Sequence, residues 1–218
     1  MSREFYLKNP DIVAIDTNVF ITLAKISTEF VKKKKNSIYA EKMRIMKRKC
    51  ESGTLKFVIL PSVLKEIYPR LNKKERTFLD EHCLILQPTN KSKFASKAYE
   101  LAKMYCDLEV MKSENGKPTM DAVIMAEATI SGLNLVTNNS RDFLSYEKGE
   151  NKRKYDRRDV SPRASDIAKL NKKLGYIYET KKLERFTPKP LSPSQYVMWF
   201  KDSGAFGMRE SYPGVDFI

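Results

Sequence analysis

The sequence predicts an α/β fold built around a parallel β-sheet. Short apolar runs without polar alternation, such as residues 12–15 and 57–60, are typical of strands that are buried on both faces. Segments with helical spacing of apolar residues follow these runs, so strands and helices alternate along the chain. An acidic residue, Asp16, comes directly after the first run, where open parallel sheets bind their ligands. The alternative is that Asp16 only begins a turn or caps the next helix.

The charge of the chain indicates a polyanionic partner. Its 218 residues suffice for one sizeable core, alone or with a smaller appended unit, and 41% of them are hydrophobic. The net charge of +14 and the isoelectric point near 9.6 are unusual. They favour nucleic acid over a membrane, because neutralisation of phosphates by Lys and Arg dominates nucleic-acid affinity.

Cysteine usage and hydropathy exclude several classes of protein. Three cysteines without CxxC spacing and one histidine, His82, argue against a disulfide framework and against a Cys/His zinc site. The first residues lack the apolar core of a signal peptide, and nowhere do about 18 uncharged apolar residues run together. We therefore expect a soluble, cytoplasmic protein without membrane contact.

The first predicted helix, residues 19–30, leads into a basic segment at residues 31–50. Between residues 32 and 49 nine basic residues face one acidic residue, a net charge of +8, with apolar residues spaced among them. This pattern is typical of an amphipathic helix with a basic face, which either is simply solvated or binds phosphates. Seven side chains are the candidates for nucleic-acid binding: Lys32, Lys33, Lys34, Lys35, Lys47, Arg48 and Lys49.

The second strand, residues 55–60, is followed by a helix that carries a glutamate. Pro61 disfavours the α conformation at Leu60, and Ser62 can cap the helix that follows. Glu66 lies within about the first turn of this helix, so it can face the same sheet edge as Asp16. A solvent-facing helix glutamate is the alternative.

The middle of the chain continues the alternation. Residues 70–81 are a charged helix or loop, and residues 83–86 are the third strand, closed by Pro88. A helix extends from Ser92 to about Cys106. The turn residues at 114–118 predict a loop.

A helix rich in small residues comes next, at residues 119–132, with Thr119 as its cap and Gly132 as its stop. Its carboxylate, Asp121, lies in the first turn. Residues 133–137 form another strand, and a polar loop with an acidic residue follows it, as happens at Asp16.

The chain after about residue 146 is expected to be an extension. It contains a basic loop at residues 148–158, a helix at residues 165–174 and an extended connection through three prolines, Pro188, Pro190 and Pro193. Its aromatic ending is expected to pack on the core, although it can also dock a partner or stack on bases. This ending contains Trp199, Phe200, Phe206, Tyr212, Phe217 and Ile218. We therefore divide the chain into a domain at residues 1–146 and an extension at residues 147–218.

Four carboxylates lie just after a strand or at the start of the next helix: Asp16, Glu66, Asp121 and Asp142. If the strands are parallel, these side chains can converge at one edge of the sheet. Converging carboxylates repel one another unless a cation compensates them, and oxygen-rich sites suit Mg²⁺ or Mn²⁺. A basic chain with an acidic metal site is the arrangement expected of a nuclease, in which Lys and Arg hold the phosphates.

Four segments resemble, in the same order, the acidic motifs of PIN-domain ribonucleases. They are residues 13–21 (VAIDTNVFI), 61–67 (PSVLKEI), 121–126 (DAVIMA) and 135–143 (LVTNNSRDF). The resemblance covers roughly residues 10–145. It implies a three-layer α/β/α sandwich with a central parallel sheet. It also implies a metal-dependent endoribonuclease that hydrolyses RNA phosphodiester bonds.

By this resemblance, Asp16, Glu66 and Asp121 are catalytic metal ligands, and Asp142 is the fourth. Many PIN domains have an aspartate where this chain has Asn139, which leaves the number of metal ions open. The resemblance also assigns supporting roles to four polar residues: Thr17, Asn18, Thr137 and Asn139.

The resemblance implies RNA, an antitoxin protein and a second copy of the chain as partners, since toxins of toxin–antitoxin pairs belong to this family. These toxins are usually shorter than this chain. A PIN-like scaffold that binds RNA or protein without cutting is the alternative, motivated by Asn139 and the long additions. A phosphatase is a third hypothesis, although residues 16–18 lack its usual Asp-x-Asp pair.

Overall fold

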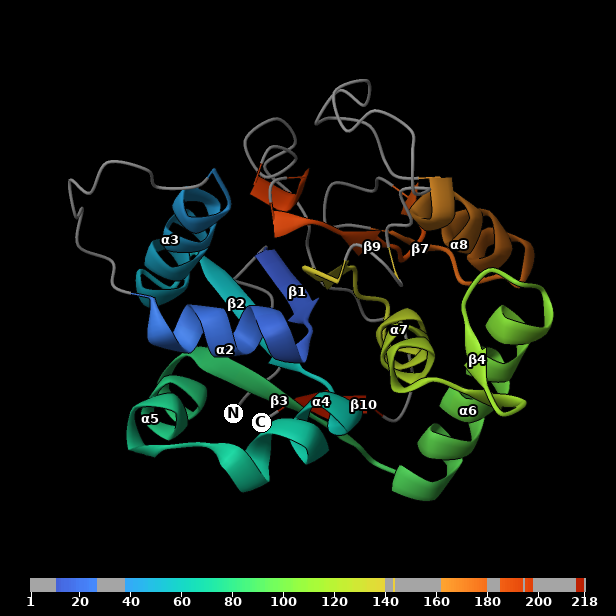
Figure 1. Ribbon diagram of the computed structural model, residues 1–218, viewed down its shortest axis with the longest axis horizontal. Helices are drawn as coiled ribbons and strands as arrows, with labels where there is room; N and C mark the ends of the chain where they lie inside the picture. Colours follow the sequence, from blue (N-terminus) through green and yellow to red (C-terminus); the bar gives the residue numbers. More distant parts are fainter. Residues whose placement is uncertain are drawn as a thin grey trace.

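The chain folds around a six-stranded sheet with the strand order β10-β3-β2-β1-β6-β9 (Figure 1). The computed structural model describes residues 11–26, 38–139, 143, 162–179, 185–193, 195–197 and 215–217. Five neighbouring strands of the sheet are parallel, and β10 at one edge is antiparallel. The predicted α/β class with a parallel central sheet is therefore confirmed.

The strands of this sheet are short. They are β1 (Asp11–Ile15), β2 (Leu55–Ile59), β3 (Cys83–Pro88), β6 (Leu135–Val136), β9 (Pro190–Leu191) and β10 (Val215–Phe217). In the register of the sheet, Ala14 lies beside Val58 on one side and Leu135 on the other. The carboxyl ends of β1, β2 and β6 therefore lie together at one edge of the sheet.

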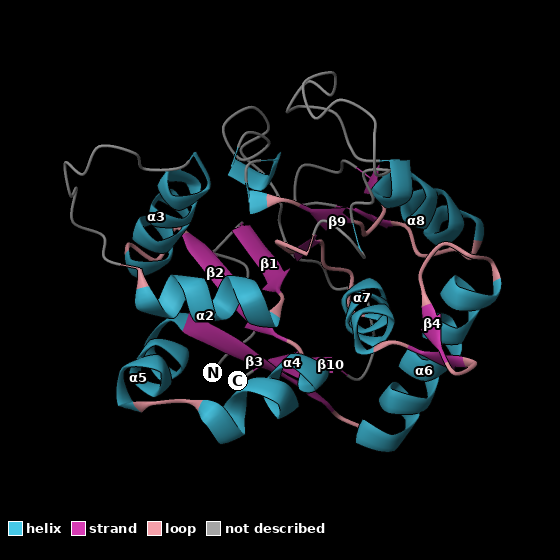
Figure 2. Cartoon of the chain, in the orientation of Figure 1, coloured by secondary structure: helices cyan, strands magenta, loops and turns pink. Residues whose placement is uncertain are grey.

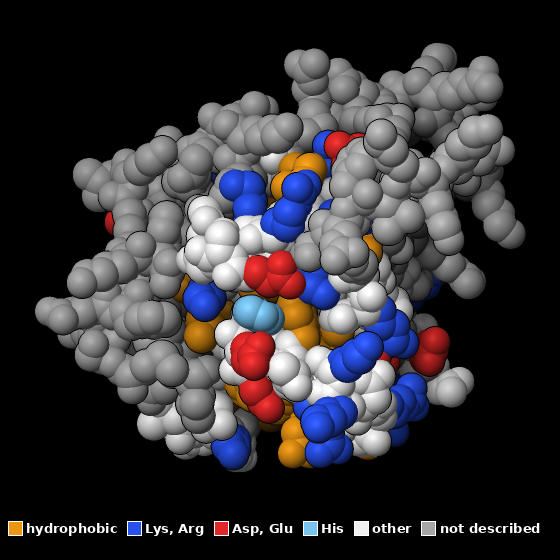
Figure 3. Space-filling view, turned by 90° about the vertical axis from the view of Figure 1, so that its left-hand side faces the viewer, with side chains coloured by type: hydrophobic (Ala, Val, Ile, Leu, Met, Phe, Trp, Pro, Cys, Tyr) orange, Lys and Arg blue, Asp and Glu red, His pale blue; other side chains and the backbone are white. Residues whose placement is uncertain are grey.

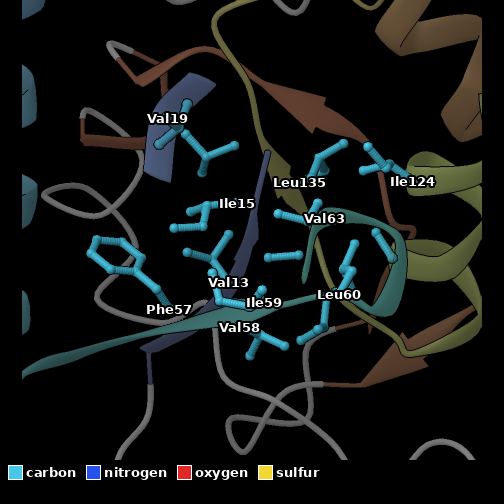
Figure 4. Packing of buried hydrophobic residues seen from close by; sticks show 14 of the residues in the cluster. Val13, Ile15, Val19, Phe57, Val58, Ile59, Leu60, Val63, Ile124 and Leu135 are labelled. Carbon is cyan, nitrogen blue, oxygen red and sulfur yellow. The ribbon is translucent and has the colours of Figure 1, made fainter. Parts of the chain in front are cut away.

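The central strands are buried on both faces, as their unbroken apolar runs predict. In β1 the side chains of Val13, Ala14 and Ile15 are fully buried, and Phe57 and Ile59 of β2 pack beside them (Figure 4). At about 25 cal/mol per Å² of apolar surface, each buried Val, Ile or Phe side chain contributes roughly 1.5–3 kcal/mol of burial free energy. The core thus fixes the strand ends that carry the polar side chains described below.

Helices cover both faces of the sheet, consistent with a three-layer α/β/α arrangement (Figures 1 and 2). The helices α2, α3 and α5 lie on one side, and α6, α7 and α8 lie on the other. The helices are α2 (Thr17–Lys25), α3 (Ile38–Glu51), α4 (Pro61–Ile67), η1 (Tyr68–Arg70), α5 (Lys73–His82), α6 (Lys91–Asp107), α7 (Met120–Ile130) and α8 (Pro162–Lys173). Connections between parallel strands are right-handed, and the strand order changes direction at β1. The helices on the two sides of this change therefore cover opposite faces of the sheet.

Several predicted boundaries shift in the structure. The first helix begins at Thr17 and ends at Lys25, since Ile26 adopts an extended backbone with φ −71° and ψ 133°. The predicted loop at 114–118 belongs to a hairpin of β4 (Ser113–Glu114) and β5 (Lys117–Pro118). Positive φ angles at Asn115 and Gly116, 51° and 72°, give it the two-residue turn that suits a hairpin.

The extension supplies strands that the sequence did not predict. The extended connection through the prolines includes β9, which pairs in parallel with β6, and β10 pairs with β3. A further antiparallel pair joins β7 (Tyr178–Glu179) to β8 (Arg185–Phe186). The predicted basic loop and most of the aromatic ending lie outside the described residues. No helix in the described part of the chain combines the length and apolar character needed to span a bilayer.

Candidate functional site

Asp16 lies at the carboxyl end of the central strand β1 and is the N-cap residue of α2. Its Oδ1 accepts a hydrogen bond from the backbone N–H of Val19 at 2.8 Å. Its Oδ2 accepts one from the hydroxyl of Thr137, which follows β6. The cap therefore exists, as the simpler interpretation of Asp16 predicted, but it occupies only one of the two carboxylate oxygens.

Burial changes the acidity of this group. Asp16 is only 4% exposed, and its desolvation raises the pKa of the carboxyl above the usual value. The Thr137 hydroxyl and the backbone N–H groups of Val19, Asn138 and Asn18 act in the opposite direction. A nearby cation would favour the charged form of this carboxyl.

Asp121 is connected to Asp16 through the residues that follow β6. It lies in the first turn of α7, and its Oδ2 accepts a hydrogen bond from Nδ2 of Asn139 at 2.9 Å. The backbone N–H of Asn139 donates to the hydroxyl oxygen of Thr137 at 3.0 Å. Because Thr137 in turn donates to Asp16, these contacts bring Asp16 and Asp121 to the same edge of the sheet.

Glu66 reaches the same region from α4. Its Oε2 accepts a hydrogen bond from the hydroxyl of Thr17 at 2.7 Å, and Thr17 directly follows Asp16. The Glu66 side chain is exposed to solvent, in contrast to Asp16. Glu66 is therefore connected to Asp121 through the ends of β1 and β6, by hydrogen bonds and by the peptide link between Asp16 and Thr17.

This chain of contacts lies at the point where the sheet changes direction. The strand β1 has β2 on one side and β6 on the other, and the connections leave them toward opposite faces. Asp16 and Thr137 follow β1 and β6 and meet across this boundary. Open α/β sheets bind their ligands at such a switch point.

The remaining predicted site residues have other surroundings. Asp142 and four of the basic candidates, Lys32 to Lys35, lie outside the described residues. Asn18 is exposed, and its carbonyl accepts a hydrogen bond from the hydroxyl of Thr22 at 2.8 Å.

The basic face of α3 has a structural role at one position. Lys47 Nζ donates to the carbonyl of Ile26 at 2.8 Å and lies 5.3 Å from the centre of the Phe78 ring. It thus satisfies a carbonyl at the end of α2. Arg48 is exposed, and Lys49 is half-buried. On the side of the molecule seen in Figure 3, the described Lys and Arg side chains are spread over the surface with acidic side chains between them.

A buried glutamate that the sequence analysis missed lies on α7. Glu127 accepts hydrogen bonds from the backbone N–H and the hydroxyl of Ser62, at 3.1 and 2.8 Å. Burial raises the pKa of the Glu127 carboxyl to about 7. Ser62 therefore lies inside α4 and does not cap it, and the predicted cap is wrong: Leu60 is the N-cap residue. A charged residue in an otherwise apolar helix was the available signal.

The donor groups at the sheet edge are carboxylate oxygens, the ligand type that Mg²⁺ and Mn²⁺ prefer. Within the described ranges, no three His, Cys, Asp or Glu side chains form a group that could hold a metal ion by themselves. Mg²⁺, however, is usually held by one or two carboxylates together with waters and substrate phosphates. Asp16 and its neighbours supply carboxylates of this kind.

Comparisons of the chain with family models, with curated proteins and with solved structures give no match.

Proposed function

We propose that the protein is a Mg²⁺- or Mn²⁺-dependent endoribonuclease of the PIN type. The observation that carries the proposal is the set of hydrogen bonds that joins Asp16 to Asp121 at the switch point of a parallel sheet, with Glu66 bonded to Thr17, the neighbour of Asp16. The order of the four acidic motifs and the net charge of +14 support it independently.

In this proposal each polar residue has a distinct task. Asp16, Glu66 and Asp121 would hold the cation, with Asp142 as the fourth ligand by resemblance to the family. The bound cation would supply an activated water and stabilise the charge that develops on the phosphate. Thr17 orients the Glu66 carboxylate, while Thr137 and Asn139 orient those of Asp16 and Asp121.

The first test is cleavage of a mixed pool of structured and single-stranded RNA by the full chain. We expect cutting with Mg²⁺ or Mn²⁺, none with EDTA, and loss of at least about a hundredfold in rate for Asp121→Asn. Asp107→Asn is the matched control, because this exposed carboxylate ends α6 and takes no part in the site. Sequencing of the product ends would identify the target.

Equal cutting by wild type and Asp121→Asn would overturn the assignment of the site. A folded wild type that cuts neither RNA nor single-stranded DNA with either metal would overturn the nuclease proposal.

The second candidate is a PIN-like scaffold that binds RNA without cutting it. The observation that favours it is Asn139, an amide that occupies the Asp121 carboxylate at a position where many PIN domains have an aspartate. This candidate predicts RNA binding that survives Asp16→Asn and Asp121→Asn and shows no metal-dependent turnover.

A further inference from the structure

An exposed tyrosine, Tyr68, directly follows α4, the helix that carries Glu66. Tyr68 begins η1, two residues after Glu66, and is 55% exposed. The guanidinium of Arg76 lies 5.5 Å from the centre of its ring, and Arg76 Nε also donates to the carbonyl of Leu71 at 3.3 Å. The contact with Arg76 restrains the ring although solvent reaches it. An aromatic ring that is exposed and restrained in this way can stack on another planar ring, such as a nucleobase.

The segment on either side of Tyr68 is rich in exposed cations, and Glu66 is an exposed carboxylate among them. Five cations of α4, η1 and α5 are exposed: Lys65, Arg70, Lys73, Lys74 and Arg76. Within the described part of the chain, none of the five forms an ion pair with a carboxylate.

The nearest acidic residue in α5 is directed inward. Glu75 is buried, accepts a hydrogen bond from the Asn72 backbone N–H at 2.9 Å and lies 3.4 Å from Lys25 Nζ. Its charge is therefore compensated inside the protein and does not offset the exposed cations. The segment from α4 to α5 runs along the lower rim of the molecule in Figure 1.

We infer that Tyr68 and these five cations, which we term the Tyr68 platform, bind single-stranded RNA and lead it to the carboxylates at Glu66. The inference rests on the proposed function and names its substrate class. A single strand exposes base faces that stack on an aromatic ring, and its phosphates pair with flanking Lys and Arg. An RNA duplex hides its base faces in the helix, so it cannot use the ring.

Binding of a fluorescein-labelled oligouridylate, measured by fluorescence anisotropy in EDTA, tests the role of the ring without cleavage. We expect Tyr68→Ala to weaken binding roughly fivefold to a hundredfold, the effect of losing one stacked base. Tyr68→Phe retains the ring and should bind within about twofold of wild type. Tyr99→Ala removes an exposed tyrosine on α6 and serves as the control.

The salt dependence of the same binding tests the role of the cations. A plot of log K against log salt concentration has a negative slope, and each phosphate contact on a single strand contributes about −0.7 to it. The double variant Lys73→Gln and Lys74→Gln should therefore make the slope about 1.4 less steep. The double variant Lys91→Gln and Lys93→Gln, on exposed positions of α6, should leave the slope unchanged.

The outcomes separate this inference from the proposed function. Equal weakening by Tyr68→Ala and Tyr99→Ala, or wild-type binding of a duplex as tight as that of oligouridylate, would overturn the Tyr68 platform even if the enzyme cuts RNA. Selective weakening by Tyr68→Ala would uphold the platform even if the wild type cuts nothing.

Discussion

At Asp16 one carboxylate serves both the fold and the candidate site. Its Oδ1 caps α2, whereas burial makes the charge costly. An asparagine retains an oxygen for the cap and an amide that can donate to Thr137, without the charge. Stability and activity are therefore expected to conflict at this residue.

We predict that Asp16→Asn melts at a higher temperature than wild type in EDTA at neutral pH, because a buried charge is removed. The same variant should lose RNA cleavage and any stabilisation by Mg²⁺. Differential scanning fluorimetry with and without Mg²⁺ measures both effects on stability. A variant that melts well below wild type would show that the charge is needed for folding.

Glu127 gives a second prediction, for the pH dependence of stability. Its pKa is about 7 in the folded protein, above the value of 4.5 expected when the chain is unfolded. The folded state therefore binds the proton more tightly. The contribution of Glu127 to stability is fully present below about pH 4.5 and is lost as the pH rises through about 7, by on the order of 3 kcal/mol.

In urea unfolding we expect Glu127→Gln to resemble wild type near pH 5 and to be the more stable protein near pH 8. The glutamine can accept from the Ser62 N–H and donate to its hydroxyl, as the protonated acid does. Glu100→Gln, an exposed position on α6, should follow wild type at both pH values. Parallel pH curves for wild type and Glu127→Gln would contradict the prediction.

Among single residues, the local sequence pattern located Asp16 and Asp121, whereas their partners Thr137 and Asn139 were indicated only by the resemblance to a family. The end of an apolar run and the first turn of a capped helix are visible in the sequence. The contact between Asp16 and Thr137, 121 residues apart, depends on the pairing of β1 with β6. No local signal determines which strands become neighbours.

Among the elements, α6, α7 and α8 are joined by a buried polar network. Asn171 of α8 accepts from the Tyr105 hydroxyl at 2.6 Å and donates to Thr129 and to the carbonyl of Pro188, at 3.1 and 2.9 Å. Burial raises the pKa of Tyr105 well above its ordinary value in this network, so the phenol remains a donor at neutral pH. The network fixes the segment that leads into β9.

We predict that Asn171→Ala destabilises the protein by about 2–4 kcal/mol, because it leaves buried donors and acceptors without partners. The free energy of unfolding in urea measures this. Lys172→Ala, at the exposed neighbouring position, should change it by no more than about 0.5 kcal/mol. An equally small change in the free energy of unfolding for both variants would show that the network does not stabilise the protein.

The elements differ in how well the sequence predicted them. The helix α7 was predicted closely, because Thr119 caps it and Gly132, with φ 68°, follows its end. The strand β9 has only two residues and includes a proline, so the sequence there predicts a loop. Its place in the sheet comes from tertiary pairing with β6.

For the whole molecule, β10 covers the outer edge of β3. Residues 215–217 pair with residues 86–88 in antiparallel register. We predict that removal of residues 215–218 lowers the urea midpoint and promotes association, since an unpaired strand edge is then exposed. Urea unfolding and light scattering of the shortened chain measure these effects. An unchanged midpoint would mean that the pairing adds no stability.

The Asp16–Thr137 contact also has a consequence for how the proposed activity would arise during folding. It joins two strands that are distant in the chain, and such long-range pairings are slow to form because loop closure costs entropy. A fragment that ends before β6 contains Asp16 but lacks the hydroxyl that orients it. If the proposed nuclease activity exists, it should therefore emerge in one late, cooperative event, and incomplete or partly unfolded chains should not cut nucleic acid.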